Sequence, residues 1–376
     1  MELVQRVLTN LEERRQRVLR GEINCIPSPF NTFTSDFPGI EQGKYYCVSA
    51  ASKGGKSQLS NYLFLYTPIL YAYHHPEQLR TQIFYFPLEE TPEKITMRFM
   101  CFLLYTMSQG KIRVSPMRLQ STVYREAVDK SILDLLNSLE YQSILNFYQD
   151  HVHFISERNP TSAWKTITNY AREAGTIHRK KILIENKETG VKQEKEVFDF
   201  YEPKDPDEYV IILWDHQSLT ALEKEKETGR GMNLKECIDK LSEYFMIFRN
   251  HYNYIPVMIA QQNSETISLD AFKSNKIRPT LAGIADSKNV GKDCSVMLGI
   301  TNPFAFELPE YLGYDIRKLK GYARFLEVVL NREGESNGVL PLYFDGATNF
   351  FKPLPPANDV VNLSKVYQMV RDNTSK

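Results

Sequence analysis

Apolar residues recur along this chain with two different spacings. Continuous apolar runs, typical of strands buried on both faces, occupy 81–88, 209–215 and 255–260, and shorter β-prone runs follow between 296 and 351. Apolar residues at helical spacing occupy 58–71, 92–107, 115–150, 161–175 and 234–250. Because strands and helices alternate, we predict a layered α/β fold with a mostly parallel, twisted sheet flanked by helices.

Two segments depart from this alternation. Residues 1–20 have the pattern of an amphipathic helix, whose apolar stripe comprises Leu3, Val4, Val7, Leu8, Leu11 and Val18. The pattern alone does not decide whether this helix folds back on its own domain or docks on another copy. The segment 180–206 has two β-prone stretches around a charged turn at 186–190, which predicts an exposed β-hairpin insertion. We assign 21–356 to one main domain and 357–376 to a C-terminal tail.

A loop of small residues follows the β-prone run Tyr45–Ser49 and ends in Gly-Lys-Ser, where a helical pattern begins. In loops of this kind, backbone N–H groups surround phosphate oxygens, the lysine reaches the terminal phosphates, and the next hydroxyl holds magnesium. The common pattern begins with glycine, but alanine stands there in this chain. The order strand, loop, helix favours an ATP or GTP site over a Gly-Gly turn with a solvated lysine. The predicted nucleotide contacts are Ala50, Ser52, Lys53, Gly54, Gly55, Lys56 and Ser57.

Three further strands end in residues suited to nucleotide chemistry. Asp215 directly follows an apolar strand, and at the carboxyl edge of a parallel sheet it can support Mg²⁺ together with Ser57, although it could be an ordinary loop aspartate. Glu89 is the preferred base for an attacking water, with Glu90 as the alternative and helix capping as a third interpretation. Gln261 ends another strand and is the candidate sensor of the terminal phosphate, although such amides more often cap loops.

Composition narrows the class of protein. The 376 residues carry 46 basic and 46 acidic side chains, so any binding to nucleic acid must come from local patches. The five cysteines are scattered and lack the close pairs of a zinc site, so we expect buried, reduced thiols. The sequence contains neither a signal-peptide pattern nor an apolar run of membrane-spanning length. We therefore expect a soluble, cytoplasmic protein without membrane contact.

Taken in order, these motifs resemble the RecA-like motor domain of DnaB-type replicative DNA helicases over about residues 21–353. The phosphate loop of that family also commonly starts with alanine. Phe86-Pro-Leu-Glu89 is similar to the family's Ser-Leu-Glu, the source of its catalytic glutamate. Asp215-His-Gln-Ser-Leu219 is similar to its Asp-Tyr-Leu-Gln-Leu, and Ala260-Gln-Gln-Asn263 to its Ser-Gln-Leu-Asn.

The resemblance also suggests which residues contact DNA and which residue reaches the ATP site of a neighbouring subunit. Residues 278–294 look like the family's segment with a DNA-facing loop, which makes Lys288, Asn289 and Lys292 candidate contacts to DNA phosphates. Lys224 and Arg230 lie in a second candidate loop, where interleaved glutamates favour a solvated charge run. In the family a Lys-x-Arg pair reaches the neighbour's ATP site. Here Arg332 is retained and Leu330 stands in the position of the lysine.

The resemblance implies an ATP-hydrolysing DNA helicase that uses Mg²⁺ and forms a homo-oligomeric ring, hexameric by analogy, around single-stranded DNA. Residues 1–20 resemble the family's linker helix, which packs on the adjacent motor domain. We do not expect the family's N-terminal helical domain in this chain, and a primase or helicase loader is a candidate partner. Two alternatives stay open: a recombinase-like or clock-type RecA ATPase, and a ring-forming scaffold in which nucleotide only stabilises assembly.

Overall fold

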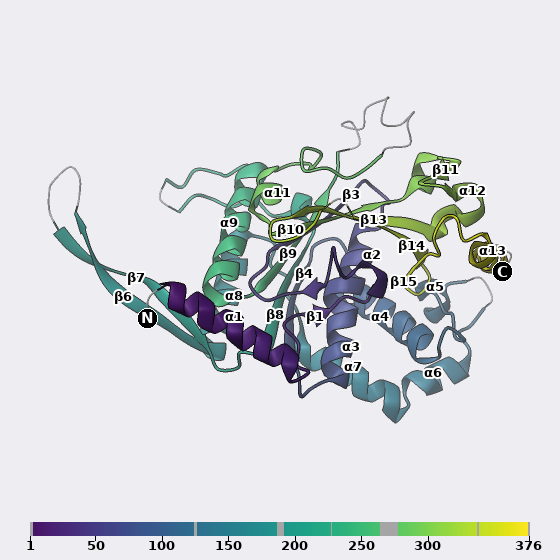
Figure 1. The fold of residues 1–376 in the computed structure, drawn as a ribbon, viewed down its shortest axis with the longest axis horizontal. Coiled ribbons are helices and arrows are strands. Elements are labelled where there is room, and N and C mark those ends of the chain that lie inside the picture. Colours follow the sequence, from purple (N-terminus) through teal and green to yellow (C-terminus); the bar gives the residue numbers. More distant parts are fainter. Residues whose placement is uncertain are drawn as a thin grey trace.

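The centre of the molecule is a nine-stranded sheet with the order β15-β14-β13-β10-β3-β9-β8-β4-β5 (Figure 1). The computed structural model describes residues 3–123, 126–185, 192–226, 228–263, 277–336 and 338–374. The strands of this sheet are β3 (Tyr46–Ala50), β4 (Arg80–Pro87), β5 (Val152–Phe154), β8 (Glu208–Asp215), β9 (Ile255–Gln261), β10 (Val296–Thr301), β13 (Ala323–Asn331), β14 (Val339–Asp345) and β15 (Phe350–Pro353). The predicted α/β class with a mostly parallel sheet is confirmed.

The strands from β10 to β5 run parallel to one another. Their registers place Ala50 opposite Gln261 and Pro87 opposite Asp215. Because the carboxyl ends of parallel strands share one edge of a sheet, the segments after β3, β9, β8 and β4 all meet there. This edge, called the carboxyl edge below, holds the predicted phosphate loop together with Asp215, Glu89 and Gln261.

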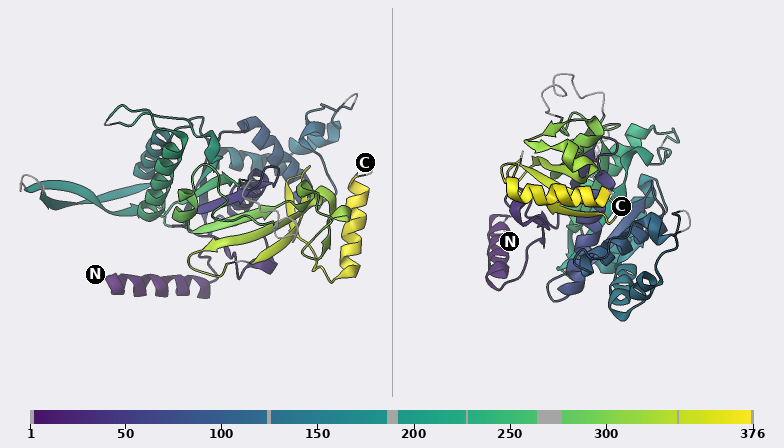
Figure 2. Two further views of the ribbon diagram at one scale, coloured as in Figure 1. Left: turned by 90° about the horizontal axis from the view of Figure 1, so that it is seen from above. Right: turned by 90° about the vertical axis from the view of Figure 1, so that its right-hand side faces the viewer.

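Helices cover both faces of the sheet (Figures 1 and 2). Those on one face are α2 (Lys56–Asn61), the π-helical turn η2 (Tyr62–Tyr66), α3 (Thr67–His74), α4 (Pro92–Met107) and α7 (Leu139–His151), and those on the other are α8 (Pro160–Ala174) and α9 (Leu234–Tyr252). Each face of the sheet carries a hydrophobic core, and side chains along β8 alternate between these two cores. Ile211 and Leu213 pack into the first, whereas Ile212 and Trp214 pack into the second. All of β8 from Tyr209 onwards is therefore buried, as its apolar run predicts.

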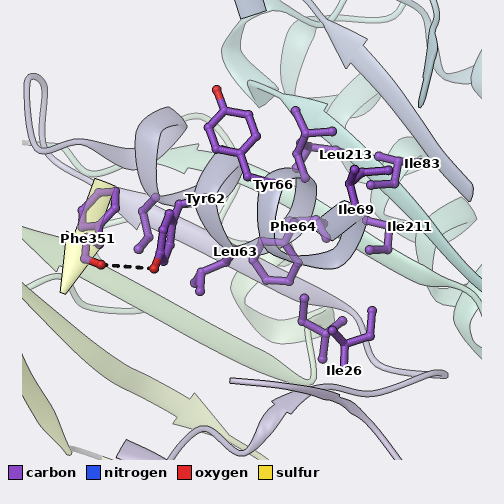
Figure 3. Close-up of a cluster of buried hydrophobic side chains, with 14 of the residues drawn as sticks. Ile26, Tyr62, Leu63, Phe64, Tyr66, Ile69, Ile83, Ile211, Leu213 and Phe351 are labelled. Carbon is purple, nitrogen blue, oxygen red and sulfur yellow. Dashed lines mark hydrogen bonds between the residues drawn. The ribbon is translucent and has the colours of Figure 1, made fainter. Parts of the chain in front are cut away.

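The core on the first face is dense in aromatic side chains (Figure 3). Phe64 is fully buried, and Tyr62 stacks on Phe30 with 5.8 Å between ring centroids. The Tyr62 hydroxyl donates a hydrogen bond to the Phe351 carbonyl at 3.1 Å, which joins the helix after the phosphate loop to β15. Truncating a buried leucine such as Leu213 to alanine is expected to destabilise this core by about 2–5 kcal/mol.

The last three strands extend the sheet with antiparallel pairing. β13 pairs with β10 so that Phe325 lies opposite Thr301 and Asn331 lies opposite Val296. The start of β13 therefore lies at the carboxyl edge and its end at the opposite edge. β14 and β15 continue outwards from β13, also antiparallel.

The N-terminal helix α1 (Leu3–Leu19) lies along the outside of the molecule (Figure 2). Arg17 forms an ion pair with Asp207 at 2.7 Å, and Arg14 pairs with Glu41 at 3.3 Å. The apolar stripe makes no comparable contact: its described members Val4, Val7, Leu8, Leu11 and Val18 are 51–68% exposed. Within the described structure, the stripe of α1 does not fold back on its own domain.

In two more segments, the structure differs in detail from the elements predicted from the sequence. The predicted hairpin exists as β6 (Gly175–Glu185) and β7 (Lys192–Pro203) and projects far from the domain, whereas its turn at 186–190 lies outside the described residues. The segment 357–376 contains the helix α13 (Val360–Thr374), whose Leu363, Val366 and Val370 are buried in a third core cluster. This helix packs beside the short helix α12 (Ile316–Leu319).

Some local predictions were imprecise. The segment 115–150 is not one helix but three, namely α5 (Pro116–Leu119), α6 (Lys130–Leu136) and α7. The helix predicted for 161–175 is α8 (Pro160–Ala174), and its cap Asn159 accepts a hydrogen bond from the Ser162 amide at 2.9 Å. The remaining short elements are β1 (Ile26–Pro27), β2 (Gly39–Ile40), α11 (Asn289–Asp293), β11 (Glu310–Tyr311), β12 (Tyr314–Asp315) and the 3₁₀ turns η1 (Asn31–Phe33), η3 (Gln217–Leu219), η5 (Pro303–Phe306) and η6 (Lys320–Tyr322).

Two general predictions can also be compared with the structure. Four of the five cysteines are buried and Cys25 is partly so, and none of the five is in a disulfide. No helix in the described part of the chain combines the length and apolar character needed to cross a membrane.

Candidate nucleotide-binding site

The phosphate loop connects β3 to α2 through a backbone that requires glycine. Gly55 precedes the first residue of α2 with φ of +103°, a conformation that side chains with a Cβ rarely adopt. A Cβ on Gly54 would lie 2.6 Å from Cβ of Ala50 and 2.8 Å from the Ala51 carbonyl oxygen. α2 continues through the π-helical turn into α3, so the loop opens a helical segment of three consecutive elements. The sequence prediction of strand, loop and helix is confirmed.

The loop residues differ in exposure. Ser52 and Lys53 are exposed, whereas Lys56 and Ser57 are half-buried at the start of α2. A half-buried lysine at the first turn of a helix, beside backbone N–H groups, is suited to phosphate binding. These residues are where the sequence places them, although their nucleotide contacts stay predictions.

Asp215 is joined to the phosphate loop by a direct hydrogen bond. The Ser57 hydroxyl donates to Oδ1 of Asp215 at 3.1 Å. The Tyr85 hydroxyl lies 3.1 Å from Oδ2 of Asp215 and 2.8 Å from Oδ1 of Asn61, so two acceptors compete for its single proton. Asp215 is only 3% exposed. Both carboxylate oxygens are therefore fixed in position by neighbouring side chains.

The electrostatic environment of Asp215 disfavours its charge. Burial raises the pKa of Asp215 to about 6, and the nearby Glu89 carboxylate contributes to this rise, whereas hydrogen bonds from Ser57 and Tyr85 and the charge of Lys56 oppose it. A cation next to this carboxylate would stabilise its ionised form. A buried aspartate of this kind is suited to supporting a metal ion.

The residues around Ser57 and Asp215 fit magnesium. The Ser57 hydroxyl and the Asp215 carboxylate are hard oxygen ligands. Within the described ranges, no three or more His, Cys, Asp or Glu side chains gather into a group that could hold a metal. The remaining ligands would therefore have to be water and substrate oxygens, and such a mixed set is the usual one for Mg²⁺.

The two glutamates after β4 have different surroundings. Glu90 accepts a hydrogen bond from Nη2 of Arg98 at 2.7 Å. Glu89 is exposed, and its Oε2 lies 3.7 Å from Nε2 of His216, next to Asp215. Burial lowers the pKa of His216 and the charge of Lys56 lowers it further, whereas Glu89 raises it. Of the two, Glu89 is the carboxylate near Asp215, and its role as the base stays a prediction.

The amides at the end of β9 divide between two roles. The side chain of Gln262 is buried and donates to Oγ of Ser49 at 2.8 Å and to the Thr280 carbonyl at 3.0 Å. The Gln261 side chain has no hydrogen-bond partner among the described residues, and its Cα lies opposite Ala50 at the phosphate loop. Gln261 is thus the amide left available at the carboxyl edge.

Arg332 lies at the opposite edge of the sheet from the phosphate loop. It follows Asn331, which pairs with Val296, and Val296 in turn pairs with Tyr46 at the start of β3. Since the loop follows Ala50, the length of β3 separates the two, about 13 Å along the strand direction. Arg332 is exposed, and its guanidinium donates hydrogen bonds to the carbonyls of Cys294 and Lys292.

The residues predicted to contact DNA fall in two separate places. Lys288 and Lys292 are exposed at the two ends of α11, with Asn289 half-buried between them. Arg230 instead forms ion pairs with Glu236 at 2.8 Å and Glu225 at 3.8 Å, which fits the interpretation of a solvated charge run.

Lys224, in the same loop as Arg230, is exposed and forms a β-bridge with Gly231. The residues 264–276, between β9 and the start of the predicted DNA-facing segment, lie outside the described part of the chain.

Sequence reasoning missed two residues of this site. Tyr85 contacts Asp215 from within β4, where its apolar neighbours suggest only a core residue. Arg324 lies beside Gly55 although it belongs to β13, far away in the sequence. An arginine inside the apolar run 323–330 was a signal for the second, but its position depends on the antiparallel pairing of β13 with β10.

Solved structures of other proteins resemble this structure over most of its length. One, an ATPase domain, superposes with a TM-score of 0.61 at 12% identity, covering 94% of this chain and 99% of that one. The chain shares the fold of that ATPase domain. A DnaB-like replicative helicase, solved to examine its interactions with primase, gives a TM-score of 0.59 at 11% identity and covers 94% of this chain and 67% of that one. The resemblance found in the sequence is thus confirmed at the level of the fold. No known family profile and no curated protein matches the sequence.

Proposed function

We propose that this protein is an ATP-dependent DNA helicase motor of the DnaB-like type, which hydrolyses ATP between subunits and moves along single-stranded DNA. The observation that carries the proposal is the carboxyl edge of the sheet. The phosphate loop, the Ser57–Asp215 pair, the Glu89 carboxylate and the amide of Gln261 all gather there. The RecA-like P-loop ATPase fold supports the same reaction class, in which ATP and water give ADP and phosphate.

In the proposed reaction, the backbone N–H groups of the loop and the Lys56 ammonium bind the phosphates of ATP. Mg²⁺ held near Ser57 and Asp215 would neutralise charge on the phosphate oxygens. Glu89 accepts a proton from the attacking water as the water oxygen bonds to the terminal phosphorus and the bond to the bridging oxygen breaks. Gln261 hydrogen-bonds the terminal phosphate and loses this contact once phosphate departs.

The position of Arg332 supports hydrolysis between subunits. In its own chain, Arg332 is separated from the phosphate loop by the length of β3, so it cannot reach the nucleotide bound there. Because it is exposed, a second copy could receive it. An arginine supplied by a neighbour neutralises the charge that develops on the transferred phosphoryl group. In the complex, its present bonds to two backbone carbonyls would be exchanged for that contact.

The proposed oligomer also gives a role to α1. Its apolar stripe is exposed, and an apolar groove of about 660 Å³ opens elsewhere on the surface between α4, α6 and α7. The groove is lined by residues such as Met97, Met100, Leu133 and Leu145. We propose that α1 of one copy packs into this groove of the next. Since the helix and the groove are different surfaces, such contacts can continue from copy to copy into a ring or a filament.

One observation favours the scaffold alternative. Leu330 replaces the lysine that accompanies the arginine in the DnaB family, which would weaken transition-state stabilisation between subunits. Particle size and the rate of ATP hydrolysis, measured with and without single-stranded DNA, separate the two functions. A helicase motor gives a ring whose hydrolysis is accelerated by DNA. A scaffold gives a ring with slow hydrolysis that does not respond to DNA, and a monomer unresponsive to DNA contradicts the proposal.

A further inference from the structure

Arg324, at the start of β13, is a buried cation with no counter-charge among the described residues. It is 6% exposed, and no carboxylate in the described structure forms an ion pair with it. Its Nη1 donates to the carbonyls of Gly321 and Ala323 at 2.8 and 2.7 Å, and its guanidinium lies 4.8 Å from the centre of the Phe344 ring. Burying an unpaired charge is strongly unfavourable, so a missing anion is expected nearby.

The guanidinium has unused hydrogen-bonding capacity. Its Nε is buried without a hydrogen-bond partner in the described structure. Nη2 has none there either, since both bonds of the side chain come from Nη1. Burial lowers the pKa of Arg324 to about 10, which still leaves the group charged at neutral pH. The contrast with Arg113 is informative, because Arg113 donates to both carboxylate oxygens of the buried Asp345 at 2.5 and 2.8 Å.

Arg324 lies directly against the phosphate loop. A Cβ placed on Gly55 would be 3.3 Å from Nε of Arg324. Since β13 and β10 lie on one side of β3 while β9, β8 and β4 lie on the other, Arg324 approaches the loop from the side away from Asp215 and Glu89. That side faces the inner phosphates of a bound nucleotide, because the terminal phosphate must lie near Glu89 and the metal-supporting residues.

Two asparagines on the same flank are similarly incomplete. Nδ2 of Asn302 donates to the Lys53 carbonyl at 3.1 Å, and Nδ2 of Asn349 donates to the Gln58 carbonyl at 3.1 Å. The Oδ1 atoms of both are buried without a partner in the described structure. Unpaired buried polar atoms are uncommon in native proteins, and here they border the loop. Both oxygens are acceptors, so they would receive hydroxyl or water hydrogens of a bound ligand, and the attraction for an anion comes from Arg324 alone.

We propose that Arg324 is a nucleotide-binding residue that contacts the α- or β-phosphate in the site of its own chain, where the nucleotide supplies the missing negative charge. This inference rests on the proposed nucleotide binding at the phosphate loop. ADP and ATP share these two phosphates, so the contact strengthens binding of both. Arg324 thus differs from Arg332, which acts on the terminal phosphate of a neighbour.

The experiment compares ADP affinity and melting temperature for the wild type, R324M, K56A and the exposed-arginine control R317M. Hydrogen bonds to charged groups predict that R324M binds ADP and ATP about 10- to 100-fold more weakly. Without nucleotide, R324M melts at the wild-type temperature or above it, since methionine removes a buried charge. The rise in melting temperature on adding ADP is smaller for R324M than for the wild type. R317M behaves as the wild type.

Failure of this inference and failure of the proposed function give different results. If the wild type and K56A both fail to bind ADP and ATP, the proposed function fails and the inference falls with it. If the wild type binds, K56A does not, and R324M binds with wild-type affinity but melts lower, Arg324 only supports the turn at Gly321 and the inference alone is wrong. Should R324M not fold, R324K takes its place. Lysine keeps the positive charge but cannot donate the two parallel hydrogen bonds of a guanidinium. ADP binding weakened by about fivefold in R324K therefore supports the contact, and wild-type affinity overturns it.

Discussion

The Ser57 hydroxyl donates a hydrogen bond to the Asp215 carboxylate at 3.1 Å, which joins two residues 158 positions apart in the sequence. This bond connects the first turn of α2 to the end of β8 across the intervening strand β9. A parallel sheet makes the contact possible, because it brings the ends of non-consecutive strands to one edge. The same contact supplies two oxygen ligands suited to a magnesium–phosphate complex.

Asp215→Asn is expected to lower ATP turnover by at least about 10- to 100-fold, because the amide supports a metal poorly. Burial raises the pKa of Asp215 to about 6, so its charge is disfavoured in the protein without ligands. The variant should therefore melt no lower than the wild type in the absence of nucleotide and metal. Turnover is measured by phosphate release and stability by thermal unfolding. Asp359→Asn is the control, because among the described residues the Asp359 carboxylate accepts its hydrogen bonds from Asn362 in the first turn of α13. Normal turnover by Asp215→Asn would remove this residue from the site.

Glu89→Gln is expected to reduce ATP turnover by about 100-fold or more while leaving ATP binding intact, because it removes only the proton acceptor. Glu90→Gln is the matched control from the next position. Since Glu90 is engaged by Arg98, its replacement should cost about 1 kcal/mol of stability or less and leave turnover nearly unchanged. Nucleotide binding is measured separately from phosphate release. The reverse pattern, with only Glu90→Gln inactive, would exchange the two roles.

The comparison with the sequence separates local signals from long-range ones. The apolar run at 209–215 matches β8 (Glu208–Asp215), and the predicted helix 92–107 matches α4, because burial periodicity is encoded in neighbouring residues. The structure places Glu89 nearer Asp215 and pairs Glu90 with Arg98, but which of the two is the base stays a prediction. The proximity of Arg324 to Gly55 was not predictable, since it requires the register of β13 on β10.

The sequence also did not predict which surface the apolar stripe of α1 packs against. An amphipathic stripe specifies that a helix needs an apolar partner, but not whether that partner belongs to the same chain. In the structure the ion pair between Arg17 and Asp207 holds the charged face of α1 against the domain, whereas the apolar stripe is exposed. The pattern of side chains therefore predicts that the helix forms, whereas its orientation depends on tertiary contacts such as the ion pair between Arg17 and Asp207.

Replacing Leu8 and Leu11 together by aspartate is expected to shift the assembly toward monomers. Both are more than half exposed in the single chain, so the change should not unfold it. Burial of each leucine in the groove of a neighbour would contribute about 1.5–3 kcal/mol, so the double variant should weaken association by about 100-fold or more. Mass measurement across a concentration series gives the result. Arg6→Asp, on the opposite face of α1, is the control, and equal particle sizes for both variants would contradict the proposed docking.

Arg332→Ala is expected to lower ATP turnover by about 10³-fold or more if the arginine acts on a neighbour's nucleotide. The sharper test is a mixture of Arg332→Ala with Lys56→Ala, each inactive alone. In the mixture, some interfaces combine an intact phosphate loop from the first variant with an intact Arg332 from the second. Phosphate release should therefore recover to a substantial fraction of the wild-type rate, and the recovery should depend on the mixing ratio. The length of β3 separates Arg332 from the phosphate loop of its own chain, so any recovery must come from interfaces between the two variants. A mixture as inactive as its components, formed from variants that still assemble, would show that Arg332 does not complete the site of another copy.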